Sequence, residues 1–452
     1  MSNVASSTTT VDWDAQMVPS GDRRGVRGRP DWTDVLFFVV LAIAAAYSLF
    51  EYHDRMDVYE QGMLIGIVPL LTWMGWLWRP LRLLTITTCL VALLAVWLYS
   101  PDGQLSHGDI QRADQVFLLK YLISSQSAIL WMCALFLLAT AAYWIGLASP
   151  TAAWIGTGLT WAGVFFGTVG LLVRWREGHL LGPDIGHIPV SNLYEVFVML
   201  ALMTALFYLY YERRYATRAL GGFVMLVISA VVVFLLWYSF SRGAHEIQPL
   251  VPALKSWWMK IHVPANFVGY GTFALAAMIG FAYLVKENSH TRSWAKLTPL
   301  FILGVILCAE PFIFGSRQVS TTWMLYFGIS AIIVGLILAF RGPIGRHLPD
   351  LEILDDIMYR AIAVGFAFFT IATVLGALWA ADAWGSYWQW DPKETWALIV
   401  WLNYAAWLHL RFMKGLRGTI SAYWALVGLI VTSFAFLGVN MFLSGLHSYG
   451  EL

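Results

Sequence analysis

Residues 384–396 read Trp-Gly-Ser-Tyr-Trp-Gln-Trp-Asp-Pro-Lys-Glu-Thr-Trp, and long apolar segments, 358–380 and 394–411, lie on either side of this run. The flanking segments decide the fold, because roughly 20 apolar residues are enough to cross a bilayer as a helix. Lipid offers the backbone polar groups no partners, so a spanning segment of this kind must be helical. The stretch therefore predicts a tryptophan-rich loop that joins two transmembrane helices at a membrane surface.

Apolar segments of this kind recur along the chain. Its 452 residues are 59% hydrophobic and 12% charged, whereas soluble domains carry about 25% charged residues. Thirteen segments qualify as spans: about 34–51, 62–79, 82–100, 127–147, 151–173, 193–211, 219–240, 263–285, 297–315, 321–340, 358–380, 394–411 and 419–441. We therefore predict an all-α, polytopic membrane helix bundle with about thirteen transmembrane helices.

The lysines and arginines of the connecting segments predict the orientation, because such residues concentrate on the cytoplasmic side. With thirteen spans, the main basic clusters fall on one side, and the exceptions on the other side include Arg174, Arg176, Lys255 and Lys260. The N-terminus is then cytoplasmic, and the C-terminus and the loop 384–396 lie outside. We therefore expect a multi-pass protein of the cell's inner (cytoplasmic) membrane. The net charge of +1 provides no basic field for nucleic acid.

Three regions are expected along the chain. Residues 1–31 are polar and lack a leading apolar run, which indicates a cytoplasmic segment rather than a cleavable signal peptide. Residues 32–150 form an N-terminal membrane extension of about four spans, and residues 151–452 form the main membrane domain. The three cysteines, Cys89, Cys133 and Cys308, lie in apolar runs without a Cys-x-x-Cys pair, so we expect no thiol redox chemistry from this chain.

Three of the ten histidines stand out by position. His262 and His447 fall on the same membrane face as the tryptophan-rich loop, where two neutral imidazoles could bind both sides of the iron in a flat macrocycle. The alternative for both is an interfacial histidine bonded to nearby backbone. His409 follows Glu394 by fifteen residues, which places it about 22 Å deeper in a helix. An ionisable residue at that depth indicates function, although a snorkelling histidine beside Arg411 is the alternative.

The tryptophan-rich loop could form an apolar platform for a flat ligand. Stacking on an aromatic ring contributes about 1 kcal/mol beyond area burial. The alternative is an interfacial aromatic belt. Asp391 and Pro392 predict a helix start, and Lys393 could bind an acidic group of the ligand or pair with an outside carboxylate. The platform residues are Trp384, Trp388, Trp390 and Trp396, with Tyr387 beside them.

Two further histidines, His179 and His187, lie in the predicted outer loop 174–192. Either could act as a lid contact or a third ligand. We favour a structural or positioning role.

Five ordered motifs resemble the WWD-domain family of haem-handling proteins, in particular its CcsA (ResC) type. They are Gly-His-Ile-Pro-Val-Ser-Asn-Leu-Tyr-Glu at 186–195, Leu-Lys-Ser-Trp-Trp-Met-Lys-Ile-His-Val at 254–263, the tryptophan-rich segment at 384–397, Trp-Leu-His-Leu-Arg at 407–411, and Gly-Val-Asn followed by Gly-Leu-His-Ser-Tyr-Gly within 438–450. The resemblance covers about residues 175–450. The segment before 150 resembles nothing that we can assign.

The resemblance implies a role for each matching residue. His262 and His447 would be the outer axial ligands of haem iron, with the loop 384–396 as the haem platform. His409 would belong to an inner site where haem enters, and the opposing ligand would come from a CcsB (ResB) partner. His187 matches the Gly-His-x-Pro position better than His179, because Pro189 follows at the right spacing.

The implied function is system II cytochrome c biogenesis. The protein would bind haem b, deliver it to the outer face, and position it for thioether attachment to the Cys-x-x-Cys-His segment of apocytochrome c. Separate thiol-reducing proteins would keep the apocytochrome reduced, and no catalytic acid, base or nucleophile is expected here. One alternative is a haem exporter or chaperone whose partner completes the ligation. A cytochrome b-like electron carrier fits less well, because it requires pairs of histidines in mid-membrane.

Overall fold

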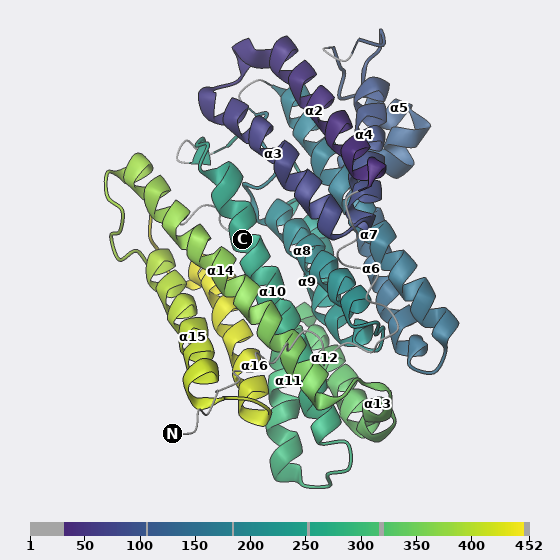
Figure 1. The fold of residues 1–452 in the computed structure, drawn as a ribbon, viewed down its shortest axis with the longest axis vertical. Coiled ribbons are helices and arrows are strands. Elements are labelled where there is room, and N and C mark those ends of the chain that lie inside the picture. The colour runs from purple at the N-terminus through teal and green to yellow at the C-terminus, as the bar shows by residue number, and fades with distance from the viewer. Residues whose placement is uncertain (1–30, 105–106, 183–184, 251–253, 316–320, 447–452) are drawn as a thin grey trace, which may run out of the picture. The chain divides into compact units, whose positions relative to one another are not determined.

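The computed structural model describes residues 31–104, 107–182, 185–250, 254–315 and 321–446. Regular structure in these ranges is helical (Figure 1). The main helices are α2 (Trp32–Tyr52), α3 (Val58–Leu77), α4 (Pro80–Tyr99), α6 (Ser125–Gly146), α7 (Pro150–Leu181), α8 (Leu193–Arg214), α9 (Gly221–Arg242), α10 (Met259–Glu287), α11 (Trp294–Gly315), α12 (Thr321–Ala339), α14 (Leu351–Trp384), α15 (Pro392–Lys414) and α16 (Thr419–Ser433). Shorter elements are η1 (His53–Arg55), α5 (Arg112–Gln115), α13 (Arg341–His347), α17 (Val439–Phe442) and the π-helical turns η2 (Leu119–Ile123) and η4 (Phe434–Gly438).

The all-α, polytopic fold is confirmed, because each of the thirteen expected spans falls on a helix. Ten helices among the described residues are long and apolar enough to cross a membrane, or eleven if α12 and α13, bent by 70°, count as one span. The helices α3 and α15 lie at expected spans but are not among the ten. The chain is therefore a multi-pass membrane protein, and the predicted orientation stays a prediction.

The chain divides by its contacts into two compact units. The first comprises residues 1–86 and 213–216, and the second comprises 87–212 and 217–452. The division lies earlier than residue 150, where the N-terminal extension was expected to end. Within the first unit, Arg82 binds the buried carboxylate of Asp34 and donates to the Thr33 hydroxyl at 2.9 Å and the Gly75 carbonyl at 2.8 Å. These bonds hold the start of α2 against the α3–α4 connection.

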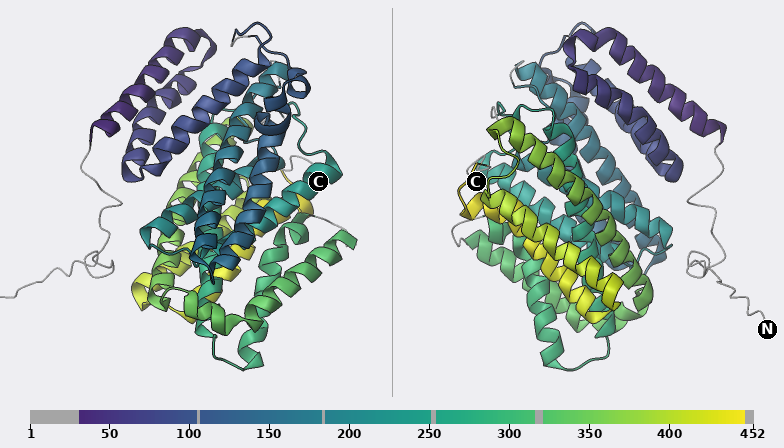
Figure 2. Two further views of the ribbon diagram at one scale, coloured as in Figure 1. Left: turned by 90° about the vertical axis from the view of Figure 1, so that its right-hand side faces the viewer. Right: turned by 60° about the vertical axis from the view of Figure 1, so that its left-hand side comes forward.

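In the second unit, α10 is the central helix, with α14 and α16 packed along it (Figure 1). Glycines permit the close approach of α10 and α14: a Cβ added to Gly365 would lie 2.4 Å from the Thr272 hydroxyl oxygen. In Figure 2, α15 and α16, drawn in yellow-green and yellow, run side by side at the C-terminal end of the colour scale. The close pairing of α10 and α14 brings the first turn of α10 against the second half of α14.

A second close pair, α6 and α7, is also built on glycine. A Cβ at Gly163 would lie 2.6 Å from the ring of Phe136, so the helices touch there only because the side chain is absent. Buried Glu177 on α7 accepts from the Tyr99 hydroxyl at 2.5 Å and from the Ser125 amide at 2.9 Å. These bonds tie the end of α4 and the start of α6 to α7 within the second unit.

Candidate functional site

A cavity of about 440 Å³ lies in the second unit, between α8, α10, α14, α15 and the η4–α17 segment. Its size falls within the range of about 300–1,000 Å³ that is usual for small-molecule sites. Its apolar wall includes Val190, Val196, Leu254, Val263, Phe267, Tyr270, Trp379, Ala397 and Phe436, and its polar groups include Asn192, Gln248, His262, Asn266, Lys393, Glu394 and Asn440. An apolar cavity with a few convergent polar groups is the usual form of a ligand site.

His262, in the first turn of α10, is the imidazole of this cavity. Its Nδ1 lies 2.8 Å from the carbonyl oxygen of Ala372 on α14. A carbonyl can only accept, so Nδ1 carries the proton, and Nε2 holds the lone pair that accepts from the Asn266 amide at 3.0 Å. A backbone carbonyl fixes the tautomer of metal-bound histidines in the same way. His262 is therefore arranged as a neutral imidazole whose Nε2 lone pair is occupied by the Asn266 amide.

Gly376, one turn after Ala372, makes room for the His262 ring. A Cβ added there would lie 2.7 Å from His262 Cε1. Glycine at 376 is thus required for the imidazole to lie against α14 in its present orientation.

The four tryptophans of the loop do not form one continuous platform. Of these four, Trp388 lines the cavity, as does the neighbouring Tyr387. Trp384 packs on Trp379 with ring centroids 5.1 Å apart, and Trp396 packs on Phe434 at 4.3 Å. Trp384 thus packs along α14, and Trp396 joins the start of α15 to η4.

Trp390 is the exception among the four. Its side chain is 68% exposed, and its ring meets Trp388 edge-on at 5.9 Å. Its φ of +59° lies in the left-handed region, which is a genuine outlier for a bulky residue. A strained and exposed aromatic residue beside a cavity is more typical of a contact surface than of a core.

Asp391 begins α15 and joins the loop to the C-terminal segment. It forms a capping box with Glu394, as the Asp-Pro sequence predicts, and accepts from the Lys393 amide at 3.1 Å. Its Oδ1 also accepts from the Leu446 amide at 2.6 Å. Leu446 is the last described residue, and His447, which follows it in the sequence, lies outside the described residues.

The ammonium group of Lys393 lies at the edge of the cavity. It donates to the Phe436 carbonyl at 3.1 Å and to the Asn440 side-chain oxygen at 2.8 Å. Both of these partners are neutral. The bonds fix the side chain and leave a positive charge near the cavity that an anionic group can use.

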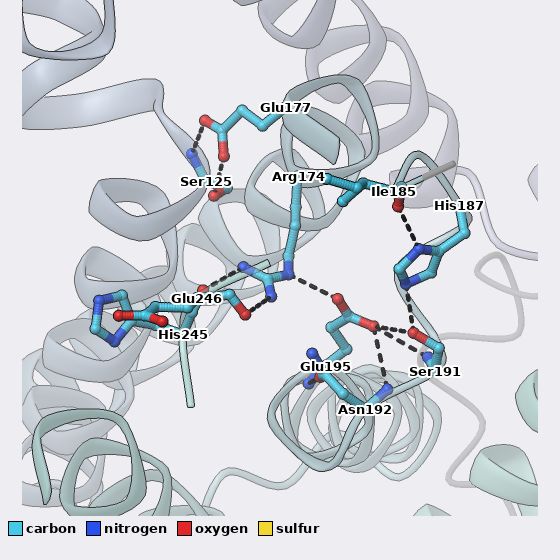
Figure 3. A network of polar contacts seen from close by, with 10 residues as sticks. All are labelled: Ser125, Arg174, Glu177, Ile185, His187, Ser191, Asn192, Glu195, His245 and Glu246. Atoms are coloured by element: carbon cyan, nitrogen blue, oxygen red, sulfur yellow. Dashed lines mark hydrogen bonds and ion pairs between the residues drawn. The ribbon is translucent and has the colours of Figure 1, made fainter. Parts of the chain in front are cut away.

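His187 lies in a network of polar contacts above the start of α8 (Figure 3). Its Nδ1 lies 2.7 Å from the Ile185 carbonyl oxygen, and its Nε2 lies 2.5 Å from the Ser191 hydroxyl. Both ring nitrogens therefore have protein partners. His262 is also bonded at both ring nitrogens, but His187, unlike His262, is not among the residues that line the 440 Å³ cavity, and this favours the positioning role for His187.

The same network holds two loops that line the cavity. Buried Arg174 forms an ion pair with Glu195 at 2.7 Å and donates to the carbonyls of His245 at 2.6 Å and Glu246 at 3.2 Å (Figure 3). The other oxygen of Glu195 accepts from the Ser191 amide at 3.0 Å. Segments 190–193 and 248–250, both in the cavity wall, are thereby joined through Arg174.

His409 lies away from this cavity. It is exposed on α15, on the outward strip that also carries Leu402 and Phe412, which are 51% and 68% exposed. Of the three expected metal ligands, His262 lies in the cavity, His409 faces away from the bundle, and His447 lies outside the described residues.

Three residues that position His262 were not expected from the sequence, namely Asn266, Ala372 and Gly376. Asn266 could have been found, because it lies one helical turn after His262 in Ile-His-Val-Pro-Ala-Asn. Ala372 and Gly376 could not, since their relation to His262 spans more than 100 residues of sequence.

Comparison with known proteins assigns this region to one family. The family model for the cytochrome c assembly protein matches residues 190–447. Similar curated proteins are each named "Cytochrome c biogenesis protein CcsA". The one from Chlorella vulgaris is 35% identical over 63% of this chain and 82% of its own length, and the one from Crocosphaera subtropica is 34% identical over 75% of this chain and 99% of its own. The one from Gloeobacter violaceus is 33% identical over 71% of this chain and 94% of its own.

Proposed function

Because the chain belongs to the cytochrome c assembly protein family, with a role in cytochrome c maturation, we propose that its cavity holds haem b for covalent attachment to apocytochrome c. The observation that carries this proposal is His262, a neutral imidazole in the wall of a largely apolar cavity inside the family-matching region. Haem is the cargo here and leaves with the cytochrome. The relatives' printed name, a cytochrome c biogenesis protein, agrees with this role.

The residues in the cavity fit haem. The apolar wall suits the porphyrin, Trp388 and Tyr387 offer aromatic faces, and His262 offers an axial nitrogen. Lys393 offers a cation for a propionate. To bind iron, Nε2 would leave the Asn266 amide, which can then bond the cavity wall or water.

The second axial ligand would be His447. The bond from the Leu446 amide to Asp391 holds the preceding residue at the tryptophan-rich loop, which supports this assignment. Trp384, Trp390 and Trp396 would act less directly: two pack on other aromatic rings, and Trp390 presents its ring at the surface.

Attachment would proceed by exchange of an axial ligand and addition of thiols. The histidine of the Cys-x-x-Cys-His segment replaces one imidazole on the iron. Each cysteine thiol then adds across a vinyl group, so that a sulfur–carbon bond forms and the thiol hydrogen goes to the other vinyl carbon. The chain contributes proximity and orientation, which can supply most of the acceleration for such a step.

His409 would serve an inner haem site at the surface of α15. Its exposure on the outward strip supports a second ligand from another chain, and a CcsB (ResB) protein is the proposed source. The site in the 440 Å³ cavity would then lie on the outer face of the bacterial inner membrane. Thiol-reducing proteins would supply apocytochrome with free cysteines.

The proposal is tested by the absorption spectrum of the detergent-purified protein. We expect bound haem with a two-imidazole spectrum, and His262→Ala should lose or shift that spectrum. His290→Ala, which changes an exposed histidine, is the matched control and should leave it unchanged. An identical spectrum in His262→Ala would refute the ligand assignment.

The second candidate is delivery of haem without ligation. A reconstitution assay separates the two candidate functions. It combines the purified chain, reduced haem and apocytochrome, with and without the partner protein. A thioether product formed without the partner would exclude a function in haem export alone. A cytochrome b-like carrier would instead keep its haem when apocytochrome is added.

A further inference from the structure

Glu310 on α11 is a buried carboxyl group that the proposed function does not use. It is 5% exposed, and its Oε1 accepts from the Ser433 hydroxyl on α16 at 2.7 Å. Its Oε2 is buried and has no partner among the described residues. One half of this carboxyl group is thus unsatisfied in the membrane domain.

Three of the four other buried glutamates, Glu177, Glu195 and Glu212, have both oxygens hydrogen-bonded to donors. The fourth, Glu394, also has one oxygen without a partner among the described residues, but its other oxygen accepts from the Gln389 and Asp391 amides. Two of the first three also have an arginine nearby: Glu195 pairs with Arg174 at 2.7 Å, and Glu212 lies 3.5 Å from Arg218. Glu310 has one donor, and no ion pair joins it to a described residue.

A carboxylate buried with one donor and no cation is strongly unfavourable, with an effective penalty of several kcal/mol. The titratable groups that interact with Glu310 are Cys308, Tyr326 and Tyr404, and none of them supplies a positive charge. The neutral acid avoids this penalty. It also changes what Oε2 needs, because a protonated carboxyl group carries an O–H donor that requires an acceptor.

A cavity of about 30 Å³ adjoins Glu310, and Thr204, Thr432 and Ser433 also line it. About 10–15 Å³ of such space is enough for one water molecule, provided that polar partners surround it. Tyr270 and Phe436 line both this cavity and the 440 Å³ cavity. The two spaces therefore share a wall.

We propose that Glu310 and the small cavity form a proton- and water-binding site, in which the neutral carboxylic acid donates to one buried water molecule. The site lies next to the large cavity, from which Tyr270 and Phe436 separate it. The proposal does not depend on the identity of the cargo in the large cavity.

Infrared spectroscopy of the detergent-purified full-length protein near neutral pH tests the site. The unmodified protein should show the C=O stretching band of a protonated carboxyl group, and the band should shift in D₂O because the acid proton exchanges. Glu310→Gln, which keeps the shape and the Ser433 bond, should lose that band. Glu212→Gln is the matched control, since it changes a buried carboxylate with full hydrogen bonding, and should retain it.

A second variant tests the geometry. Ser433→Ala removes the hydrogen bond to Oε1, so the band should persist and move to higher frequency. The proposal is overturned if Glu310→Gln retains the whole band, if the band does not respond to D₂O, or if Ser433→Ala leaves its frequency unchanged.

Discussion

His262 shows how one imidazole is prepared by groups on two helices. The Ala372 carbonyl sets its tautomer, the Asn266 amide occupies Nε2, and Gly376 leaves space for the ring. Ala372 acts on Nδ1, Asn266 on Nε2, and Gly376 on the position of the ring. Substitutions of such outer partners typically reduce metal affinity by about 10–100-fold.

Gly376→Ala is therefore expected to displace the His262 ring and weaken haem binding by about tenfold or more, although alanine favours the helix by about 1 kcal/mol over glycine. Haem titration of the purified protein measures the effect. Gly158→Ala on α7 is the control, because a Cβ there meets nothing within 4 Å. Equal affinities in the two variants would contradict the role of Gly376.

Trp390 presents the opposite case, a residue that the local backbone does not favour. Its φ of +59° suits glycine, and strain of this kind costs about 1 kcal/mol or more. Trp390→Gly should therefore leave the thermal unfolding midpoint unchanged or higher, since the side chain is 68% exposed. Cytochrome c maturation in cells should nevertheless fall. A lower midpoint with normal maturation would mean that the ring serves stability alone.

At the scale of elements, the start of α15 is the junction of the site. Asp391 caps the helix, and through Leu446 it also holds the segment that leads to His447. Asp391→Ala should cost about 1 kcal/mol of stability as a lost cap, and it should also alter the two-imidazole spectrum because the C-terminal segment is released. Thermal unfolding and the haem spectrum report the two effects separately.

Asp350→Ala is the matched control for this prediction. Asp350 precedes α14 as its N-cap residue but makes no side-chain capping bond. It should change neither measurement much. If Asp391→Ala reduces stability while the spectrum stays the same, Asp391 is a cap and nothing more.

The elements themselves were predictable because the signal is local. A run of apolar residues becomes a helix in lipid whatever its neighbours are, and the Asp-Pro start of α15 needs only its own first turn. The site was predictable in part: His262, Trp388 and Lys393 do meet at one cavity. Two features could not be predicted: Trp384 and Trp396 pack on Trp379 and Phe434, and His409 points away from the bundle. Both depend on which helices lie next to one another, and hydrophobic periodicity does not encode the neighbours of a helix.

At the scale of the molecule, the cavity belongs to one compact unit. Its lining residues run from Val190 to Asn440, nearly the range 190–447 that the family model matches. The helices α2 and α3 belong to the first unit, where they pack on each other. Removal of residues 1–77 should therefore leave the haem spectrum unchanged, and it deletes an even number of expected spans, which preserves the predicted orientation.

A longer truncation tests how much of the N-terminal region can be removed before the second unit is destabilised. Removal of residues 1–99 also takes away Ala95 and Tyr99, which pack in a buried cluster with Val169 and Val173 on α7. Glu177 then keeps its bonds to Ser125 but loses the Tyr99 hydroxyl, and a hydrogen bond to a charged group contributes about 1.5–3 kcal/mol. We expect the shorter truncation to bind haem with native affinity and the longer one to lose thermal stability. If the shorter truncation loses the spectrum, then α2 and α3 contribute to the haem site itself, and the second unit is not sufficient for it.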